Sequence, residues 1–144
     1  MFASPPKPIL LVIEETPVIA PLLETAVRSR EDSWAEIVSA ATSEEGLKTA
    51  ADRRPEIIFL DWMLPPLHGE EFLAEQCRIP DIADLPVLVY SALEGTALSD
   101  LREFYPAVKT IIAKPLSSSK LFEAMKPHLK TRLLPRADRP PARD

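Results

Sequence analysis

Five short apolar runs, set apart by segments of a different periodicity, constrain the fold of this chain more than any other feature. Each run holds four to six residues that are mostly β-branched or aliphatic, and the second run is the weakest: Ile9–Ile13, Ala35–Ala40, Ile57–Leu60, Val87–Tyr90 and Thr110–Ala113. Short runs that are apolar throughout are typical of strands buried on both faces of a parallel sheet. We therefore expect five such strands.

The segments between the runs repeat apolar residues at helical spacing instead. Residues three and four positions apart share one face of an α-helix. Each segment contains such a set: Ile19, Leu22, Leu23 and Ala26; Leu47, Ala50 and Ala51; Leu73, Gln76 and Cys77; Leu98, Leu101 and Tyr105; Leu121, Met125 and Leu129. We expect one helix in each segment, with Cys77 in the core.

Start signals support the same helices. Candidate caps precede the first, second and last of them: Thr16 followed by Pro17, the capping box formed by Thr42 and Glu45, and Ser117–Ser119. Two prolines fall inside expected helices, where proline removes an amide donor. Pro21 is expected to shorten or bend the first helix, and Pro127 to end the last.

A strand and a helix thus alternate five times along the chain. Such alternation predicts a parallel sheet with helices on both faces. Because the crossovers between parallel strands are right-handed, all five strands point the same way and their C-terminal ends share one edge. Ligands of open α/β sheets bind beyond that edge.

Polar residues stand where the predicted strands end, and they suggest a phosphoryl site. The first strand is followed by Glu14 and Glu15, the third by Asp61, the fourth by Ser91 and the fifth by Lys114. Carboxylates that converge need a proton or a hard divalent cation, and Mg²⁺ accepts one or two carboxylates while keeping positions for phosphate oxygens. A lysine and a hydroxyl suit the remaining phosphoryl oxygens, and an aspartate can be the nucleophile.

Four stretches around these residues resemble the receiver domains of two-component response regulators. They are LLVIEETPVI, PEIIFLDWMLPPLHGEEF, LPVLVYSA and IIAKPLSSSKL, in the family's order and spacing. The resemblance covers roughly residues 8–130, with residues 1–7 and 131–144 expected to be flexible tails. It implies a flavodoxin-like (βα)5 fold, with helices on both faces of a five-stranded parallel sheet of strand order 2-1-3-4-5.

The resemblance also implies a role for each residue of the edge. A sensor histidine kinase or a phosphotransfer protein would phosphorylate Asp61. Mg²⁺ would be held by Glu14, Glu15, Asp61 and the backbone carbonyl of Met63. Ser91 would bind the phosphoryl group as the switch hydroxyl, and Lys114 would pair with another phosphoryl oxygen.

The sequence departs from the family pattern at two of these places, which leaves a second interpretation open. Family members usually carry at least one Asp in the acidic pair, whereas Glu14 and Glu15 are each longer by a methylene, and Mg²⁺ tolerates little distortion. Ile111 stands at the position of the switch aromatic residue. The alternative is a degenerate pseudo-receiver, acting as a phosphorylation-independent interaction module.

Composition limits the remaining functions. A chain of 144 residues with a net charge of −5 is expected to form one cytoplasmic domain with no direct nucleic-acid or membrane binding. The expected partners are the kinase and a downstream protein target, with a possible homodimer through the face of the fourth helix, fifth strand and fifth helix. An enzyme is not expected, because a haloacid dehalogenase-type phosphatase needs a second Asp where Met63 stands.

Overall fold

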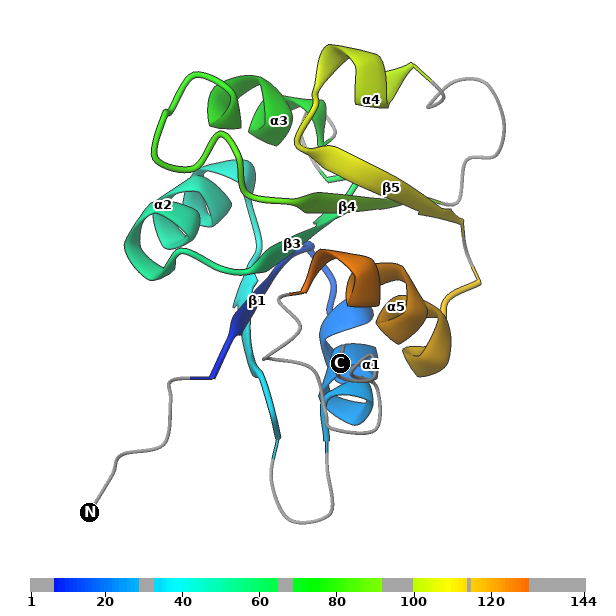
Figure 1. Cartoon of the computed structure of the whole chain (residues 1–144). Coiled ribbons are helices and arrows are strands. Elements are labelled where there is room, and N and C mark those ends of the chain that lie inside the picture. The colour runs from blue at the N-terminus through cyan, green and yellow to red at the C-terminus, as the bar shows by residue number, and fades with distance from the viewer. Residues whose placement is uncertain (1–6, 29–32, 65–68, 92–99, 114, 130–144) are drawn as a thin grey trace, which may run out of the picture.

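The computed structural model of the chain describes residues 7–28, 33–64, 69–91, 100–113 and 115–129. Within these residues five strands form one parallel sheet in the order β2-β1-β3-β4-β5. The predicted fold class and strand order are confirmed. Figure 1 shows the sheet between two layers of helices, with α1 and α5 on one face and α2, α3 and α4 on the other.

The strands agree closely with the five apolar runs. They are β1 (Ile9–Ile13), β2 (Glu36–Ala40), β3 (Ile57–Asp61), β4 (Val87–Ser91) and β5 (Val108–Ala113). The largest difference is at β5, which begins two residues before the predicted Thr110. Its register against β4 shifts between Val87 and Leu88, which pair with Val108 and Thr110. The exposed Lys109 lies at this irregularity. Because Lys109 interrupts the apolar run, the sequence pattern placed the start of the strand too late.

Alternate side chains of the strands build two separate halves of the core. Leu10 and Val12 of β1 pack into the cluster beneath α1 and α5, whereas Leu11 and Ile13 pack into the cluster beneath α2 and α3. All four side chains are fully buried. Because successive strand residues point to opposite faces, an unbroken apolar run satisfies both layers at once.

The helices occupy the five predicted segments. They are α1 (Ile19–Ala26), α2 (Ser43–Arg53), α3 (Glu70–Gln76), α4 (Leu101–Phe104) and α5 (Ser118–Met125), the last continued by a 3₁₀ turn, Lys126–His128. Leu98 lies outside the described residues. Cys77 is exposed just after α3 rather than in the core, so that prediction was wrong. Gln76, the residue before it, is the one that turns inward.

Two of the three predicted caps are present. The hydroxyl of Thr42 accepts a hydrogen bond from the Glu45 amide at 3.1 Å, and the hydroxyl of Ser117 accepts one from the Lys120 amide at the same distance. Pro21 occupies the third position of α1, within the first turn, where no intrahelical partner is needed. Pro127 lies in the 3₁₀ turn after α5 has ended.

The predicted start of α1 was wrong. The helix begins at Ile19, not after Thr16, and its N-cap residue Val18 provides no side-chain hydrogen bond. The orphan amides of this helix are satisfied by a residue of the site described below. The proline signal was misleading because a carboxylate outside the helix supplies the cap.

We predict that Thr42→Ala lowers the free energy of unfolding by about 1 kcal/mol, because α2 loses its N-cap acceptor. Thr49→Ala is the matched control, since Thr49 lies inside the same helix and alanine is a better helix former there. Urea unfolding followed by circular dichroism measures both. Equal losses for the two variants would contradict the importance of the cap.

Candidate functional site

The C-terminal edge of the sheet brings three of the predicted site residues together. Asp61 is the last residue of β3 and pairs with Tyr90 of β4, while Ser91 follows as the last residue of β4. The amide of Trp62 continues this pairing by donating to the Tyr90 carbonyl at 3.0 Å. Glu14 comes directly after β1, whose last residue pairs with the residue before Asp61.

Asp61 is partly exposed, and the turn that follows it is closely packed. Its Oδ1 accepts a hydrogen bond from the Met63 amide at 3.0 Å. The Gly69 amide donates to the Trp62 carbonyl at 2.8 Å, which closes the loop before α3. A Cβ at Gly69 would lie 2.9 Å from the Asp61 carbonyl oxygen, so only glycine fits here without moving the backbone. The turn therefore holds Asp61 in a fixed orientation.

Glu14 turns its carboxylate toward the start of α1. Its Oε1 accepts hydrogen bonds from the amides of Val18 at 3.0 Å and Ile19 at 2.9 Å, and its Oε2 accepts one from Ala20 at 3.1 Å. The first amides of a helix have no intrahelical partner and carry the positive end of the helix dipole, so they stabilise a buried anion. Only 5% of Glu14 is exposed. The residue is an internal cap of α1.

A fourth donor to Glu14 comes from the neighbouring part of the sheet. The hydroxyl of Tyr90 donates to Glu14 Oε1 at 3.1 Å, and only 1% of the tyrosine is exposed. Burial raises the pKa of Tyr90 far above its ordinary value, and the charges of Glu14 and Asp61 raise it further. The phenol therefore stays protonated. Tyr90 was missed as a site residue, because at the end of an apolar run it looked like one more core side chain.

The hydrogen bonds of Glu14 bear on the predicted metal site. Among the described ranges, no three His, Cys, Asp or Glu side chains lie in a group suited to a metal ion. The carboxylate of Glu14, a predicted ligand, accepts hydrogen bonds from three backbone amides and from the Tyr90 hydroxyl. Glu15, the next residue, is exposed, and Asp61 is partly exposed. Met63, whose backbone carbonyl was the fourth predicted ligand, is also exposed. Since Mg²⁺ is often bound through one or two carboxylates and several waters, Glu15 and Asp61 still fit it.

The remaining predicted residues differ in how far the structure describes them. Ser91 is buried, with 1% of its surface exposed. Ile111 pairs with Val89 and is partly buried against the core beneath α2 and α3. Lys114 lies outside the described residues. At this edge, Asp61 and the buried Ser91 thus lie at the ends of neighbouring strands, and α1 begins nearby with Glu14 as its cap.

Comparison with known proteins gives a family match over most of the chain. The response regulator receiver domain model matches residues 10–126. The phosphate regulon transcriptional regulatory protein PhoB of Pseudomonas aeruginosa is 28% identical over 120 residues, covering 83% of this chain and 50% of that protein. Hybrid signal transduction histidine kinase D of Dictyostelium discoideum is 30% identical over 120 residues, covering 80% of this chain and 7% of the kinase.

A solved structure supports the fold independently. The chemotaxis protein CheY4 of Vibrio cholerae superposes with a TM-score of 0.73 at 18% identity, covering 86% of this chain and all of that one. At this identity the likeness concerns the fold alone. The chain spans about half the length of the PhoB regulator that it matches.

We predict that Tyr90→Phe lowers the free energy of unfolding by about 1.5–3 kcal/mol, the usual worth of a hydrogen bond to a charged group. Tyr105→Phe is the matched control, because its hydroxyl donates at 2.9 Å to the exposed Glu70. We expect a loss below about 0.5 kcal/mol for this control. Denaturant titration at pH 7 measures both, and a small loss at Tyr90 would contradict its role.

The raised pKa of Tyr90 predicts a pH dependence. Its folded pKa lies above its unfolded value, so the stabilisation is complete below about pH 10 and is lost as the pH rises further. Above pH 10 the stability of the unmodified protein relative to Tyr90→Phe should fall by about 1.4 kcal/mol per pH unit. Unfolding titrations between pH 8 and 11 test this. A constant difference across the range would contradict it.

Proposed function

The chain belongs to the response regulator receiver domain family, and we propose that it is a signalling module in which Asp61 accepts a phosphoryl group. The donor is a sensor histidine kinase or a phosphotransfer protein. The proposal is supported chiefly by the position of Asp61, which is partly exposed at the C-terminal edge of the sheet and adjacent to the strand that carries Ser91. Receiver domains are signalling domains rather than enzymes of the usual kind.

Each residue of the edge has a task in this transfer. The Met63 amide holds Oδ1 of Asp61, which orients the carboxylate so that its other oxygen can attack phosphorus. Ser91 donates a hydrogen bond to the bound phosphoryl group, and Lys114 pairs with another of its oxygens. Glu15, Asp61 and the Met63 carbonyl would hold Mg²⁺, which would neutralise charge on the phosphoryl oxygens.

Glu14 supports this site without being a ligand. By capping α1 from inside, it fixes the turn that contains Glu15. Its hydrogen bond from Tyr90 ties the same turn to β4, directly before Ser91. We therefore assign the metal-binding role of the acidic pair to Glu15.

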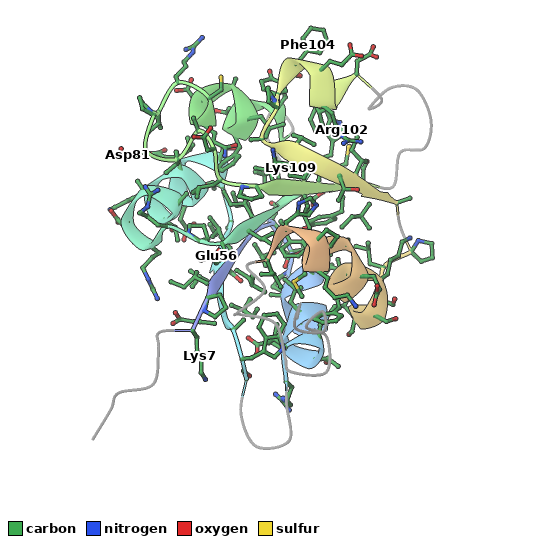
Figure 2. The ribbon with its side chains drawn as sticks, viewed as in Figure 1. Lys7, Glu56, Asp81, Arg102, Phe104 and Lys109 are labelled. Atoms are coloured by element: carbon green, nitrogen blue, oxygen red, sulfur yellow. The ribbon has the colours of Figure 1, made fainter. Side chains whose placement is uncertain are left out.

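The signal leaves the module through contacts with another protein in the cytoplasm. Phe104 of α4 is 74% exposed, and Figure 2 shows it on the outer side of the molecule with Arg102 near it. Phe104 is therefore available to a partner from α4, and the proposed homodimer would use the face formed by α4, β5 and α5. None of the helices in the described part of the chain is long and apolar enough to cross a membrane.

A second candidate function is a pseudo-receiver that binds its partner without phosphorylation. Two observations favour it. The Glu14 carboxylate is turned away into a helix cap, which leaves a smaller acidic set, and Ile111 is partly buried among core residues rather than being an aromatic ring able to rotate. Such a module would present the same surfaces with or without a phosphodonor.

We predict that a small phosphodonor such as acetyl phosphate, given with Mg²⁺, adds one phosphoryl group to the protein and none to Asp61→Asn. Asp84→Asn is the control, since that exposed carboxylate lies before β4 at the opposite edge of the sheet. Intact-protein mass spectrometry provides the measurement. If the unmodified chain stays unlabelled under conditions that label other receivers, the pseudo-receiver is the better description.

Metal titration separates the two glutamates. In a Trp34→Phe background, Trp62 next to Asp61 is the remaining indole and should report Mg²⁺ by a fluorescence change. We predict that Glu15→Gln weakens the apparent affinity at least about tenfold, as expected when a charged ligand is lost. Glu14→Gln should weaken it less. A larger effect at Glu14 would return the metal-binding role to that residue.

A further inference from the structure

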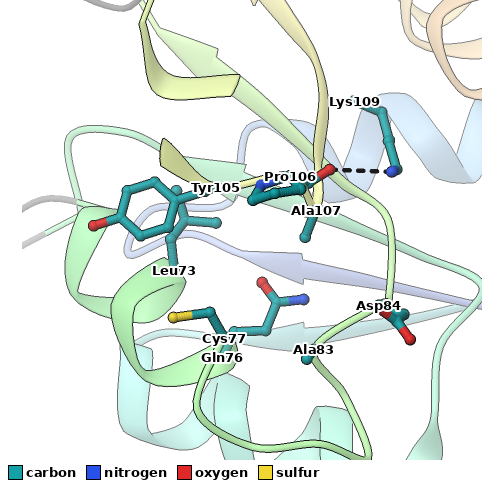
Figure 3. A pocket seen from close by; sticks show the side chains of 9 residues that line it. All are labelled: Leu73, Gln76, Cys77, Ala83, Asp84, Tyr105, Pro106, Ala107 and Lys109. Carbon is teal, nitrogen blue, oxygen red and sulfur yellow. Dashed lines mark hydrogen bonds between the residues drawn. The ribbon is translucent and has the colours of Figure 1, made fainter. Parts of the chain in front are cut away.

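A pocket of about 330 Å³ opens at the end of the sheet opposite to Asp61. Its lining comes from the C-terminal part of α3, the segment before β4 and the segment before β5, as Figure 3 shows: Leu73, Gln76, Cys77, Ala83, Asp84, Tyr105, Pro106, Ala107 and Lys109. The pocket therefore lies at the N-terminal ends of β4 and β5. It is separate from the phosphoryl site and independent of the function proposed for it.

The floor of the pocket holds a polar group in a fixed orientation. Gln76 is 99% buried, with 1% exposed, and its amide nitrogen donates to the Ile82 carbonyl at 3.0 Å and to the Leu85 carbonyl at 3.1 Å. Both hydrogens of the amide are thereby used, so the other end must be the carbonyl oxygen. Figure 3 shows this oxygen directed toward the side of the pocket formed by Tyr105 and Ala107. Within the described part of the chain it has no donor.

Other polar atoms of the lining are bonded to the protein itself. The Tyr105 hydroxyl donates to Glu70, the Lys109 ammonium donates to the Pro106 carbonyl at 3.1 Å, and the Cys77 thiol donates to the Ala74 carbonyl at 3.1 Å. The exposed Asp84 carboxylate stands at the rim. What remains is an apolar wall with an aromatic ring and one acceptor, the side-chain oxygen of Gln76, that faces the pocket.

We propose that this pocket binds a small planar heteroaromatic molecule that donates an N–H hydrogen bond to Oε1 of Gln76. Ser43 Oγ is the buried side-chain atom without a partner among the described residues, so Gln76 Oε1 is open to the pocket and water can reach it there. A ligand that fills the pocket displaces this water, so a ligand with a matching donor gains more than one that leaves the oxygen unpaired. The volume is at the lower end for ligand pockets, which suits a molecule of one or two rings. The ring of Tyr105 provides a surface on which such a molecule can pack.

Two probes of almost the same shape test the hydrogen bond. Indole carries the N–H donor, and 1-methylindole lacks it. In ¹H–¹⁵N spectra of the full chain, indole should shift the backbone amides of Ala83 and Ala107 and the side-chain amide of Gln76 in a saturable manner. The dissociation constant for 1-methylindole should be about tenfold larger. Equal affinities would overturn the role of Gln76, and shifts confined to other surfaces would overturn the site.

Variants at the walls test the location without removing the two hydrogen bonds that Gln76 makes. Ala107→Leu fills the pocket and should abolish the indole shifts, whereas Glu75→Leu, on the exposed side of α3, should leave them unchanged. If Ala107→Leu gives a spectrum without native dispersion, Cys77→Phe at the rim replaces it. Indole binding that survives in a folded pocket-filling variant would overturn the proposal. Asp61→Asn should bind indole normally, which keeps this test independent of phosphorylation.

Discussion

The buried carboxylate of Glu14 is the interaction on which the arrangement of this edge depends. A carboxylate of which only 5% is exposed requires several hydrogen-bond donors close to it. Three amides of α1 and the Tyr90 hydroxyl provide them, from a helix and from a strand that are far apart in the sequence. The start of α1, the turn with Glu15 and the end of β4 are therefore fixed relative to one another by a single side chain.

The same hydrogen bonds explain why Glu14 stands at the position of a metal ligand in the sequence but caps a helix in the structure. A strand-end carboxylate can bind a metal or cap the next helix, and its hydrogen bonds decide between the two. Here Glu14 caps the helix, which leaves Glu15 and Asp61 as the carboxylates of the edge that are not committed to a helix cap. The longer side chain of a glutamate makes the cap possible, because it spans the distance from the end of β1 to the amides of Val18, Ile19 and Ala20.

Much of the fold was predictable from the sequence, because burial on both faces of a parallel sheet leaves an unbroken apolar run. The five runs, the caps at Thr42 and Ser117 and the ending of α5 near Pro127 followed from local signals. The errors arose where a distant partner decides the local structure. The start of α1 depends on Glu14, the role of Tyr90 depends on a residue 76 positions away, and the position of Gln76 depends on carbonyls of the next loop.

The short helix α3 lies between the turn that holds Asp61 and the pocket at the opposite end of the sheet. Its first residue, Glu70, follows the glycine packed against Asp61, and its last residue, Gln76, forms the floor of the pocket. Seven helical residues make a rod of about 10 Å between these two ends. The spacing between the glycine turn behind Asp61 and the Gln76 floor of the pocket is therefore set by the length of this one helix.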